Sequence, residues 1–158
     1  MSSHPQVLCQ DPLFYTIMET KTDSPLGLAS YLRITPEHGV MEVGHLHFSK
    51  LLKKTPAATE AMFLMMQRAF DELKYRRYEW KCDSLNKPSI EAAKRLGFSF
   101  EGLFRQDKVI KGRNRNTSWF SIIDAEWPML KKRFQAWLQK ENFDESGEQI
   151  RRLSEFPL

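Results

Sequence analysis

Residues 41–102 decide the fold of this chain. They read MEVGHLHFSKLLKKTPAATEAMFLMMQRAFDEL (41–73) and, after Lys74, YRRYEWKCDSLNKPSIEAAKRLGFSFEG (75–102). The apolar pattern predicts a strand, a short basic loop, a helix, a second strand, a short loop containing an asparagine, and a second helix ending at Gly-Phe. A loop that enters a helix leaves backbone N–H groups free at the helix N-terminus, and such groups bind phosphate without a metal. The first half therefore predicts an anion-binding loop.

The first loop combines positive charge with a helix start signal. Three lysines follow the strand: Lys50, Lys53 and Lys54. Thr55 is expected to cap the helix through its hydroxyl, and Pro56 falls at the first helical position, where a missing N–H costs little. The amides after the proline are predicted to be free donors at the positive end of the helix dipole: those of Ala57, Ala58 and Thr59. An ordinary Thr-Pro cap beside a solvated lysine cluster explains the same residues equally well.

The two halves together resemble the GNAT acetyltransferase superfamily, which uses acetyl-coenzyme A, and within it the branch of ribosomal-protein N-terminal acetyltransferases. The family's pyrophosphate loop reads Gln/Arg-x-x-Gly-x-Gly/Ala, followed in this branch by Thr-Glu-Ala, and residues 53–61 match it as KKTPAATEA. The second half matches Asn-x-x-Ser at Asn86 and Ser89, then Leu-Gly-Phe at 96–98 and Glu-Gly at 101–102. The resemblance covers residues 14–128, and its specificity lies in the order and spacing of the motifs.

The sequence departs from the family pattern in three places. Lys53 replaces Gln/Arg, and Pro56 replaces the first glycine of the loop, which removes one phosphate donor. Ala93 stands where many members carry a tyrosine that protonates the leaving thiolate. The family also has a strand and two helices before the first strand predicted here, and only residues 1–12 precede it, so the chain is expected to be shortened at its N-terminus.

The pattern along the chain predicts one domain over residues 12–142 and a C-terminal tail over 143–158. Strands are expected at 13–19, 28–34, 40–48, 75–82, 98–110 and 117–123, and helices at 56–73, 88–96 and 126–140. This order predicts an α/β (α+β) fold: a mixed, mostly antiparallel twisted sheet with helices on both faces. The resemblance implies that strands 40–48 and 75–82 run parallel and splay apart, with the pantetheine of coenzyme A in the gap.

Composition limits the cellular setting and the ligand. The net charge of +4 suits an anionic ligand such as coenzyme A. Nucleic acid would suit it too, but the basic residues are scattered and no finger or RNA-binding signature occurs, so a nucleic-acid partner is not predicted. There is no apolar run of the ~20 residues that a membrane helix needs, and no secretory signal. The two cysteines, Cys9 and Cys82, favour a cytoplasmic or nuclear setting, and Cys82 is interpreted as a buried thiol.

Three side chains are candidates for proton transfer: Ser89, Glu42 and Asp107. The resemblance implies that Ser89 protonates the thiolate, whereas a first-turn helix serine commonly bonds locally. Glu42 lies on the strand that enters the loop, where many members place a carboxylate; its alternative is a cross-strand pair with Arg33 or Lys81. Asp107 lies one residue from a catalytic carboxylate of some members; its alternative is a surface charge.

The other groups predicted for the site are the side-chain amide of Asn86 and backbone N–H groups. Asn86 is expected to bond the pantetheine amide or to cap its helix, and a backbone N–H near Leu46 or Phe48 is expected to meet the oxyanion. His45 and His47 share one face of their strand, but no third ligand is evident, so no metal is predicted. The residues predicted to contact the cofactor are Lys53, Lys54, Thr55, Ala57, Ala58, Thr59, Asn86, Leu46 and Phe48.

The predicted function is transfer of an acetyl group from acetyl-coenzyme A to a primary amine by direct attack in a ternary complex. The resemblance favours a protein N-terminal α-amine as the acceptor, and a polyamine or another small amine remains an alternative. An α-amine with a pKa of ~7.7–8.0 is already partly neutral, whereas lysine at ~10.4 needs a stronger base. The alternative is a non-catalytic module that binds coenzyme A or serves as an interaction surface.

Overall fold

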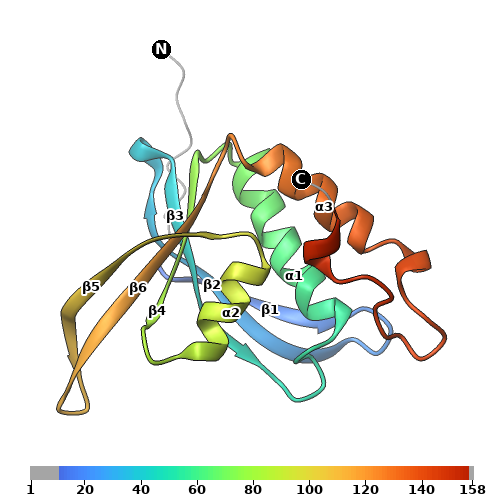
Figure 1. Cartoon of the computed structure of the whole chain (residues 1–158), viewed down its shortest axis with the longest axis horizontal. Helices are drawn as coiled ribbons and strands as arrows, with labels where there is room; N and C mark the ends of the chain where they lie inside the picture. The colour runs from blue at the N-terminus through green and yellow to red at the C-terminus, as the bar shows by residue number, and fades with distance from the viewer. Residues whose placement is uncertain (1–10, 157–158) are drawn as a thin grey trace.

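The computed structural model describes residues 11–156 as a six-stranded sheet with helices packed against it (Figure 1). The strands are β1 (Leu13–Glu19), β2 (Ser24–Thr35), β3 (Val40–Phe48), β4 (Arg77–Asp83), β5 (Ser99–Ile110) and β6 (Arg113–Ile123). The α-helices are α1 (Pro56–Gln67), α2 (Lys87–Arg95) and α3 (Trp127–Trp137). In this part of the chain no helix is both long and apolar enough to cross a membrane.

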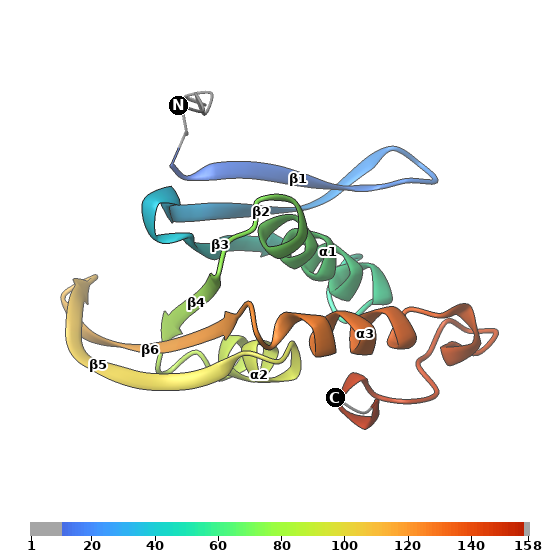
Figure 2. The same ribbon diagram turned by 90° about the horizontal axis from the view of Figure 1, so that it is seen from above.

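The strand order is β1-β2-β3-β4-β6-β5, and among these described strands only β3 and β4 are parallel neighbours. Their pairing ends at Val43 and Trp80, although β3 continues to Phe48 and β4 to Asp83. The two strands therefore run parallel and then part, as the resemblance implied. Figure 2 shows the resulting shape: β1–β3 and β5–β6 form two wings of a strongly bent sheet that meet at β4.

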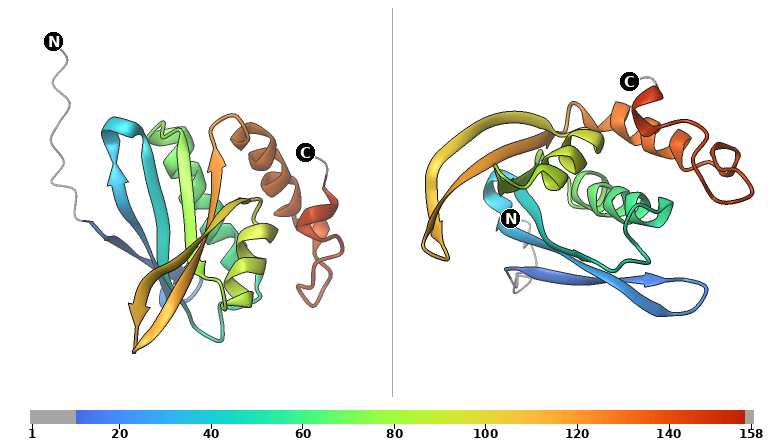
Figure 3. Two further views of the ribbon diagram at one scale, coloured as in Figure 1. Left: turned by 60° about the vertical axis from the view of Figure 1, so that its left-hand side comes forward. Right: turned by 60° about the horizontal axis from the view of Figure 1, so that its bottom comes forward.

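The predicted fold class, a mixed and mostly antiparallel sheet with helices, is confirmed; within the described residues, however, the α-helices lie on one face of the sheet rather than on both. Tyr78 on β4 contacts Phe70, which follows α1, at 6.0 Å between ring centroids, and Phe98, which follows α2, at 5.9 Å. One face of β4 thus meets the ends of both helices. Phe63 of α1 stacks on Trp127 and Phe134 of α3, so α3 lies in the same layer. Figure 3 (left) shows the strands on one side and the three helices on the other.

The physical reason is the direction of the two crossovers. The connection β3-α1-β4 moves one place along the sheet, and β4-α2-β5 moves on in the same direction past β6. β4 and β5 are parallel because both pair antiparallel with β6. Parallel crossovers are right-handed, so two crossovers that move in the same direction put their helices on the same face. The sequence pattern gave the elements but not the position of β5 beyond β6.

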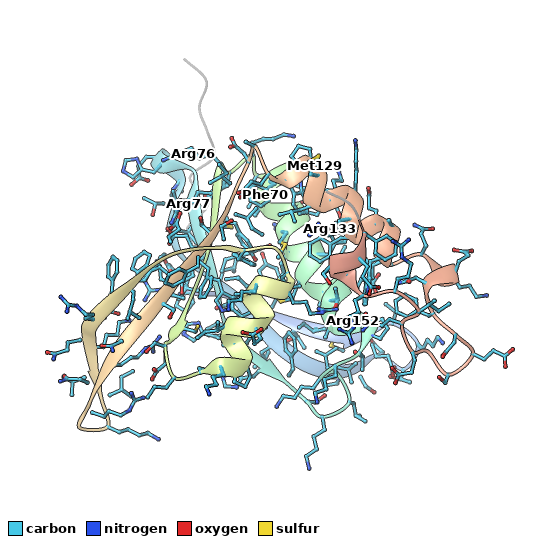
Figure 4. All side chains as sticks on the ribbon, in the orientation of Figure 1. Phe70, Arg76, Arg77, Met129, Arg133 and Arg152 are labelled. Atoms are coloured by element: carbon cyan, nitrogen blue, oxygen red, sulfur yellow. The ribbon has the colours of Figure 1, made fainter. Side chains whose placement is uncertain are left out.

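The core fills the layer between this face and the helices, and aromatic rings dominate it. Phe70, labelled in Figure 4, stacks on Trp127 at 5.1 Å, and Trp80 meets Phe98 edge to face at 5.5 Å. Apolar side chains alternate with charged ones along β3 and β4: Met41, Val43, Tyr78 and Trp80 are in the core, whereas Glu42, Glu79 and Lys81 point to the opposite face. That opposite face, which no helix of residues 11–156 covers, is called the open face below.

Two predicted elements differ in detail from the structure. The helix expected over 56–73 is α1 followed by a π turn at Arg68–Glu72. The polar hairpin loop expected over 111–116 is a two-residue turn, Lys111 and Gly112, with φ of 50° and 73°. Positive φ at both positions matches the twist of the flanking strands, so residues 113–116 continue as strand in spite of their polarity.

The segment after Asn142, predicted as a tail, returns to pack against α3. Trp137 donates to Gln149 Oε1 at 3.1 Å, and Arg133 donates through Nε to the carbonyl of Phe156 at 3.0 Å. Leu153 is 1 % exposed and belongs to the core. Packed structure therefore extends well past the predicted domain boundary at residue 142.

Candidate active site

The loop between β3 and α1 is closed by its own hydrogen bonds. Lys53 donates its amide to the carbonyl of Ser49 at 3.0 Å, and Thr55 donates its amide and hydroxyl to the carbonyl of Leu52 at 3.3 and 2.7 Å. The Thr55 hydroxyl accepts from the amide of Ala58 at 3.3 Å, so Thr55 is the N-cap and Pro56 the first helical residue. Both predictions are confirmed.

These bonds divide the predicted phosphate donors into two groups. The amides of Lys53, Thr55 and Ala58 are used within the loop. Within residues 11–156, no acceptor is found for the amides of Lys54 and Ala57. Thr59 is buried and accepts a hydrogen bond from Arg95 at 3.0 Å, so its side chain ties α1 to α2. Of these loop amides, those of Lys54 and Ala57 therefore remain as candidate donors to an anion.

Two open cavities flank the loop. One, of about 590 Å³, lies at the end of β3 and is lined by Leu46, Phe48 and Lys53 among others. The other, of about 570 Å³, lies between β1 and α1 and includes Ala57 and Glu60. Neither is lined by residues of β4 or α2. The predicted pantetheine path between β3 and β4 is thus supported by the strand register rather than by a cavity.

The end of β3 is distorted where it leaves β4. The register with β2 shifts between Leu28 and Ser30, and His45 has a φ of 49°. The hydroxyl of Ser30 donates to the carbonyl of Gly44 at 3.1 Å and lies 2.8 Å from His45 Nδ1. A hydroxyl has one hydrogen, so with that hydrogen on Gly44 the Nδ1 of His45 is the donor in this pair.

Ser89 sits in the first turn of α2 on the helix-covered side of β4. Its hydroxyl accepts a hydrogen bond from Trp80 Nε1 at 3.0 Å, and its amide donates to Asn86 Oδ1 at 3.2 Å. Asn86 is therefore the N-cap of α2, the alternative foreseen for it. Burial raises the pKa of the neighbouring Cys82 thiol, which opposes a nucleophilic role for that residue.

Glu42 lies on the open face within a chain of ion pairs. Its Oε2 contacts Arg33 Nη1 and lies 3.0 Å from Lys81 Nζ, which in turn lies 2.6 Å from Glu79 Oε2. The Glu42 side chain is 5 % exposed. Both cross-strand partners foreseen for it are present together, so Glu42 has a clear structural role, and its role as a base stays a prediction.

The chain of ion pairs continues across β4 to β5. Arg77 bonds Glu79 at 2.7 Å and forms a two-pronged pair with Glu101 at 2.7 and 2.5 Å. Burial raises the pKa of Glu79, but the bonds from Lys81 and Arg77 outweigh it and leave that pKa below its ordinary value. Lys81 also lies 3.8 Å from the ring centre of Trp119. The charges at 77, 79, 81 and 83 alternate along β4, a period-two signal by which the sequence could have revealed this network.

Asp107 lies on β5 and accepts a hydrogen bond from the hydroxyl of Thr117 at 2.7 Å. Thr117 is the register partner of Asp83, the last residue of β4.

Trp80, the hydrogen-bond partner of Ser89, belongs to the core face, whereas Glu42 belongs to the open face. The structure therefore places the predicted acid, Ser89, and the predicted base Glu42 on opposite faces of the sheet, close to the point where β3 and β4 part.

The Arg77–Glu101 pair predicts acid sensitivity. The hydrogen bonds from Arg77 lower the pKa of Glu101 from 4.5 to about 2. A carboxyl with a lowered pKa in the folded state stabilises the fold fully above its unfolded pKa and loses that contribution as the pH falls toward 2. We expect wild type to be more stable than Glu101→Gln at pH 6 and the difference to shrink between pH 4.5 and 2. Urea unfolding across this range measures it, and a difference independent of pH would contradict the assignment.

The comparison with protein families matches the strands, the basic loop and the helices in one segment of the chain. Residues 5–99 match the model of the acetyltransferase (GNAT) domain family, a segment that contains β3, the basic loop, α1, β4 and α2. The chain belongs to the GNAT acetyltransferase family. The resemblance stated from the motifs is thereby confirmed.

Relatives of this GNAT chain include proteins known by sequence and by structure. It is 30 % identical over 117 residues to the uncharacterized N-acetyltransferase p20 of Bacillus licheniformis, covering 72 % of this chain and 63 % of that protein. It is 52 % identical to a GCN5-related N-acetyltransferase from Brucella melitensis, with a TM-score of 0.90 over 92 % of this chain and 66 % of that one. A Vibrio cholerae protein proposed to be a ribosomal-protein-serine acetyltransferase shares the fold at 21 % identity, with a TM-score of 0.63 over 72 % of this chain and 64 % of that one.

The GNAT chain spans less than two thirds of the length of the Bacillus and Brucella proteins. No group of three or more His, Cys, Asp or Glu residues that could hold a metal occurs within the described part of the chain.

Proposed function

We propose that this chain transfers the acetyl group of acetyl-coenzyme A to a primary amine, in particular the α-amine of a protein N-terminus, by direct attack in a ternary complex. The observation that carries this proposal is the end of the β3–β4 pairing at Val43 and Trp80, while both strands continue. Strands that part leave backbone donors and acceptors unpaired along their facing edges, where an extended amide-containing chain can bind. A thioester held there is reachable from both faces of the sheet.

The diphosphate is expected to bind at the N-terminus of α1. The amides of Lys54 and Ala57 are unpaired among the residues described, and the side chains of Lys50, Lys53 and Lys54 lie in the same exposed loop. Helix dipole and lysine charge add to these donors. The small side chain of Ala57 allows the anion to approach the backbone closely.

The free thiol of Cys82 suits a reducing cytoplasmic setting.

We assign the two proton transfers, from the acceptor amine and to the departing sulfur, to opposite faces of the sheet. The acceptor amine loses a proton on the open face, where Glu42 and Asp107 are the candidate bases, and an α-amine needs little help because it is partly neutral. Bound acetyl-coenzyme A supplies the acyl carbon, and a backbone N–H near Leu46 or Phe48 stabilises the charge on its oxygen. One such donor is worth ~2.7–4 kcal/mol. Ser89 supplies the proton to the departing sulfur from the helix side.

Ser89→Ala is expected to lower kcat while leaving the KM for acetyl-coenzyme A nearly unchanged. General acids contribute about 10²–10⁴-fold, and a thiolate with a pKa near ~8.5 leaves readily, so we expect roughly a hundredfold loss, at the low end of the range. Steady-state release of free thiol measures both constants. Since the change also removes the partner of Trp80, Trp80→Phe is the control: it should keep turnover because the Ser89 hydroxyl remains. A similar loss in both variants would make Ser89 structural.

Binding is tested first and catalysis second. At a hundredfold excess over Kd, acetyl-coenzyme A should stabilise the chain by about 2.7 kcal/mol in thermal unfolding. Thiol release on addition of a peptide with a free α-amine, and none with the same peptide blocked, would support the enzyme. Absence of any thermal shift in folded protein would rule out both coenzyme A functions.

The second candidate is a module that binds coenzyme A without transferring the acetyl group. The observation that favours it is the commitment of Glu42 to Arg33 and Lys81, which leaves the open face without an unpaired carboxylate at this position. A thermal shift with acetyl-coenzyme A but no thiol release with any amine would select this candidate.

A further inference from the structure

The outer part of the β5–β6 hairpin, residues 105–115, carries a charge equal to the net charge of the whole chain. Residues 105–115 contain five Lys or Arg residues and one Asp, a net charge of +4, and the rest of the chain has 19 basic and 19 acidic residues. Figure 1 shows this hairpin extending away from the helices at the far edge of the sheet. A charge concentrated on one projecting element creates a local field that a neutral body does not oppose.

Most of these cations have no internal partner. Arg113 pairs with Asp83, but no carboxylate in residues 11–156 lies within 4.0 Å of the other basic side chains of the hairpin, which are Arg105, Lys108, Lys111 and Arg115. The single acid of residues 105–115, Asp107, is bonded to Thr117. The hairpin is therefore positive at its surface rather than balanced by internal ion pairs.

The same hairpin has a free strand edge. Within residues 11–156, β5 is the last strand of the sheet and pairs only with β6. Its apolar side chains are also open to solvent, with Val109 71 % exposed and Phe104 51 % exposed. A free edge that carries both apolar and basic side chains fits an extended peptide, whose backbone completes the ladder.

The register identifies which backbone groups face outward. Lys111 and Gly112 form the two-residue turn, so Ile110 and Arg113 close the ladder as a hydrogen-bonded pair. Pairs alternate along an antiparallel ladder, so the next pair, Val109 and Asn114, is not hydrogen-bonded and Val109 directs its N–H to the outer edge.

We propose that the β5–β6 hairpin binds an acidic polypeptide segment in extended form, by strand addition to the edge of β5. Acidic side chains of the segment meet the basic side chains of the hairpin, and its backbone pairs with that of β5. The positive charge opposes pairing with a second copy of this chain. Resting on the proposed function, the acceptor is then an acidic protein rather than a cationic polyamine.

The strand edge makes it possible to distinguish a bound polypeptide from a bound nucleic acid. Both are anionic and would respond to salt and to lysine substitution. Only a polypeptide offers backbone groups to the outward N–H of Val109. We therefore test charge and edge separately.

The probe is a short fluorescent peptide in which Glu and Thr alternate, with a blocked N-terminus so that it cannot be acetylated. Fluorescence anisotropy with the whole chain at low salt should show binding that weakens as salt is added. Lys108→Glu with Lys111→Glu should weaken binding about tenfold or more. The matched pair Lys132→Glu with Lys140→Glu, exposed on and after α3, should leave binding unchanged. Equal losses in the two pairs, or no binding by wild type, would overturn the proposal.

Val109→Pro removes the outward N–H without removing a ladder bond and should weaken peptide binding about tenfold, whereas Val109→Ala should not. If Val109→Pro binds the peptide as wild type does, or if a single-stranded oligonucleotide binds more tightly than the peptide, strand addition is refuted. Thermal unfolding confirms that each variant is folded, and Lys108→Gln with Lys111→Gln repeats the charge test with a milder change. Because the probe has no free amine, its binding is independent of whether acetyl transfer occurs.

Discussion

Ala57→Asp is expected to abolish acetyl-coenzyme A binding while leaving the fold intact or slightly more stable. Ala57 is the second residue of α1, beside the unpaired amides at the helix N-terminus. A carboxylate here would lie about 4 Å from a bound diphosphate, and two like charges at that distance repel by about 4 kcal/mol near a protein surface. That corresponds to roughly a thousandfold in Kd. The same carboxylate stabilises the helix by about 0.3–1 kcal/mol, because it faces the positive end of the dipole.

The opposite signs of these two effects make the experiment decisive. Isothermal titration with acetyl-coenzyme A measures the loss of binding, and thermal unfolding without ligand measures the stability. Ala125→Asp, the same substitution in the exposed turn before α3, is the matched control and should bind as wild type does. If Ala57→Asp is stabilised as expected and still binds, the loop is only a helix cap.

Lys81→Met is expected to destabilise the fold by about 3 kcal/mol. Lys81 is 8 % exposed and lies between Glu42 and Glu79, whose side chains are 5 % and 10 % exposed. Removing one partner of a buried pair costs about 3–5 kcal/mol because a charge is left without compensation. The lower end is expected here, since Arg33 and Arg77 still neutralise the two carboxylates.

Urea unfolding measures this loss against a matched substitution. Lys94→Met breaks the exposed pair with Glu91, whose side chains are 57 % and 71 % exposed, and should cost less than about 1 kcal/mol. Lys81→Arg keeps the charge and should recover part of the stability. Equal stability of Lys81→Met and Lys94→Met would mean that water reaches the β4 network.

The sequence predicted the strands best where apolar residues alternate and a turn residue follows. β1 and β3 have the predicted bounds, and Pro56 and Thr55 mark the start of α1 as expected. The hairpin at Lys111–Gly112 was misjudged because its strand residues are polar on both faces, and a strand without a buried face has no apolar period to detect. The segment after Asn142 was missed for a related reason: isolated residues such as Leu153 and Phe156 carry no period either.

For the candidate site, too, the sequence predicted local features and missed the contacts between distant segments. Local geometry such as the caps at Thr55 and Asn86 could be predicted because each depends on residues within one turn. The use of the Ala58 amide by the Thr55 cap was also local, and it follows from the preference of a cap hydroxyl for the third amide of the helix. The Ser30–His45 pair and the ion pairs of Glu42 join residues on different strands, and strand register decides them.

By itself the sequence determined the order of elements, the basic loop at a helix N-terminus and the GNAT family, because these depend on neighbours along the chain. Only the tertiary structure decided that all three helices share one face, since that follows from where β5 docks beyond β6. It also decided which loop amides stay free and that Ser89 and Glu42 lie on opposite sides of the sheet. The physical reason is that hydrogen bonds and ion pairs between distant segments form only once strand pairing fixes their distances.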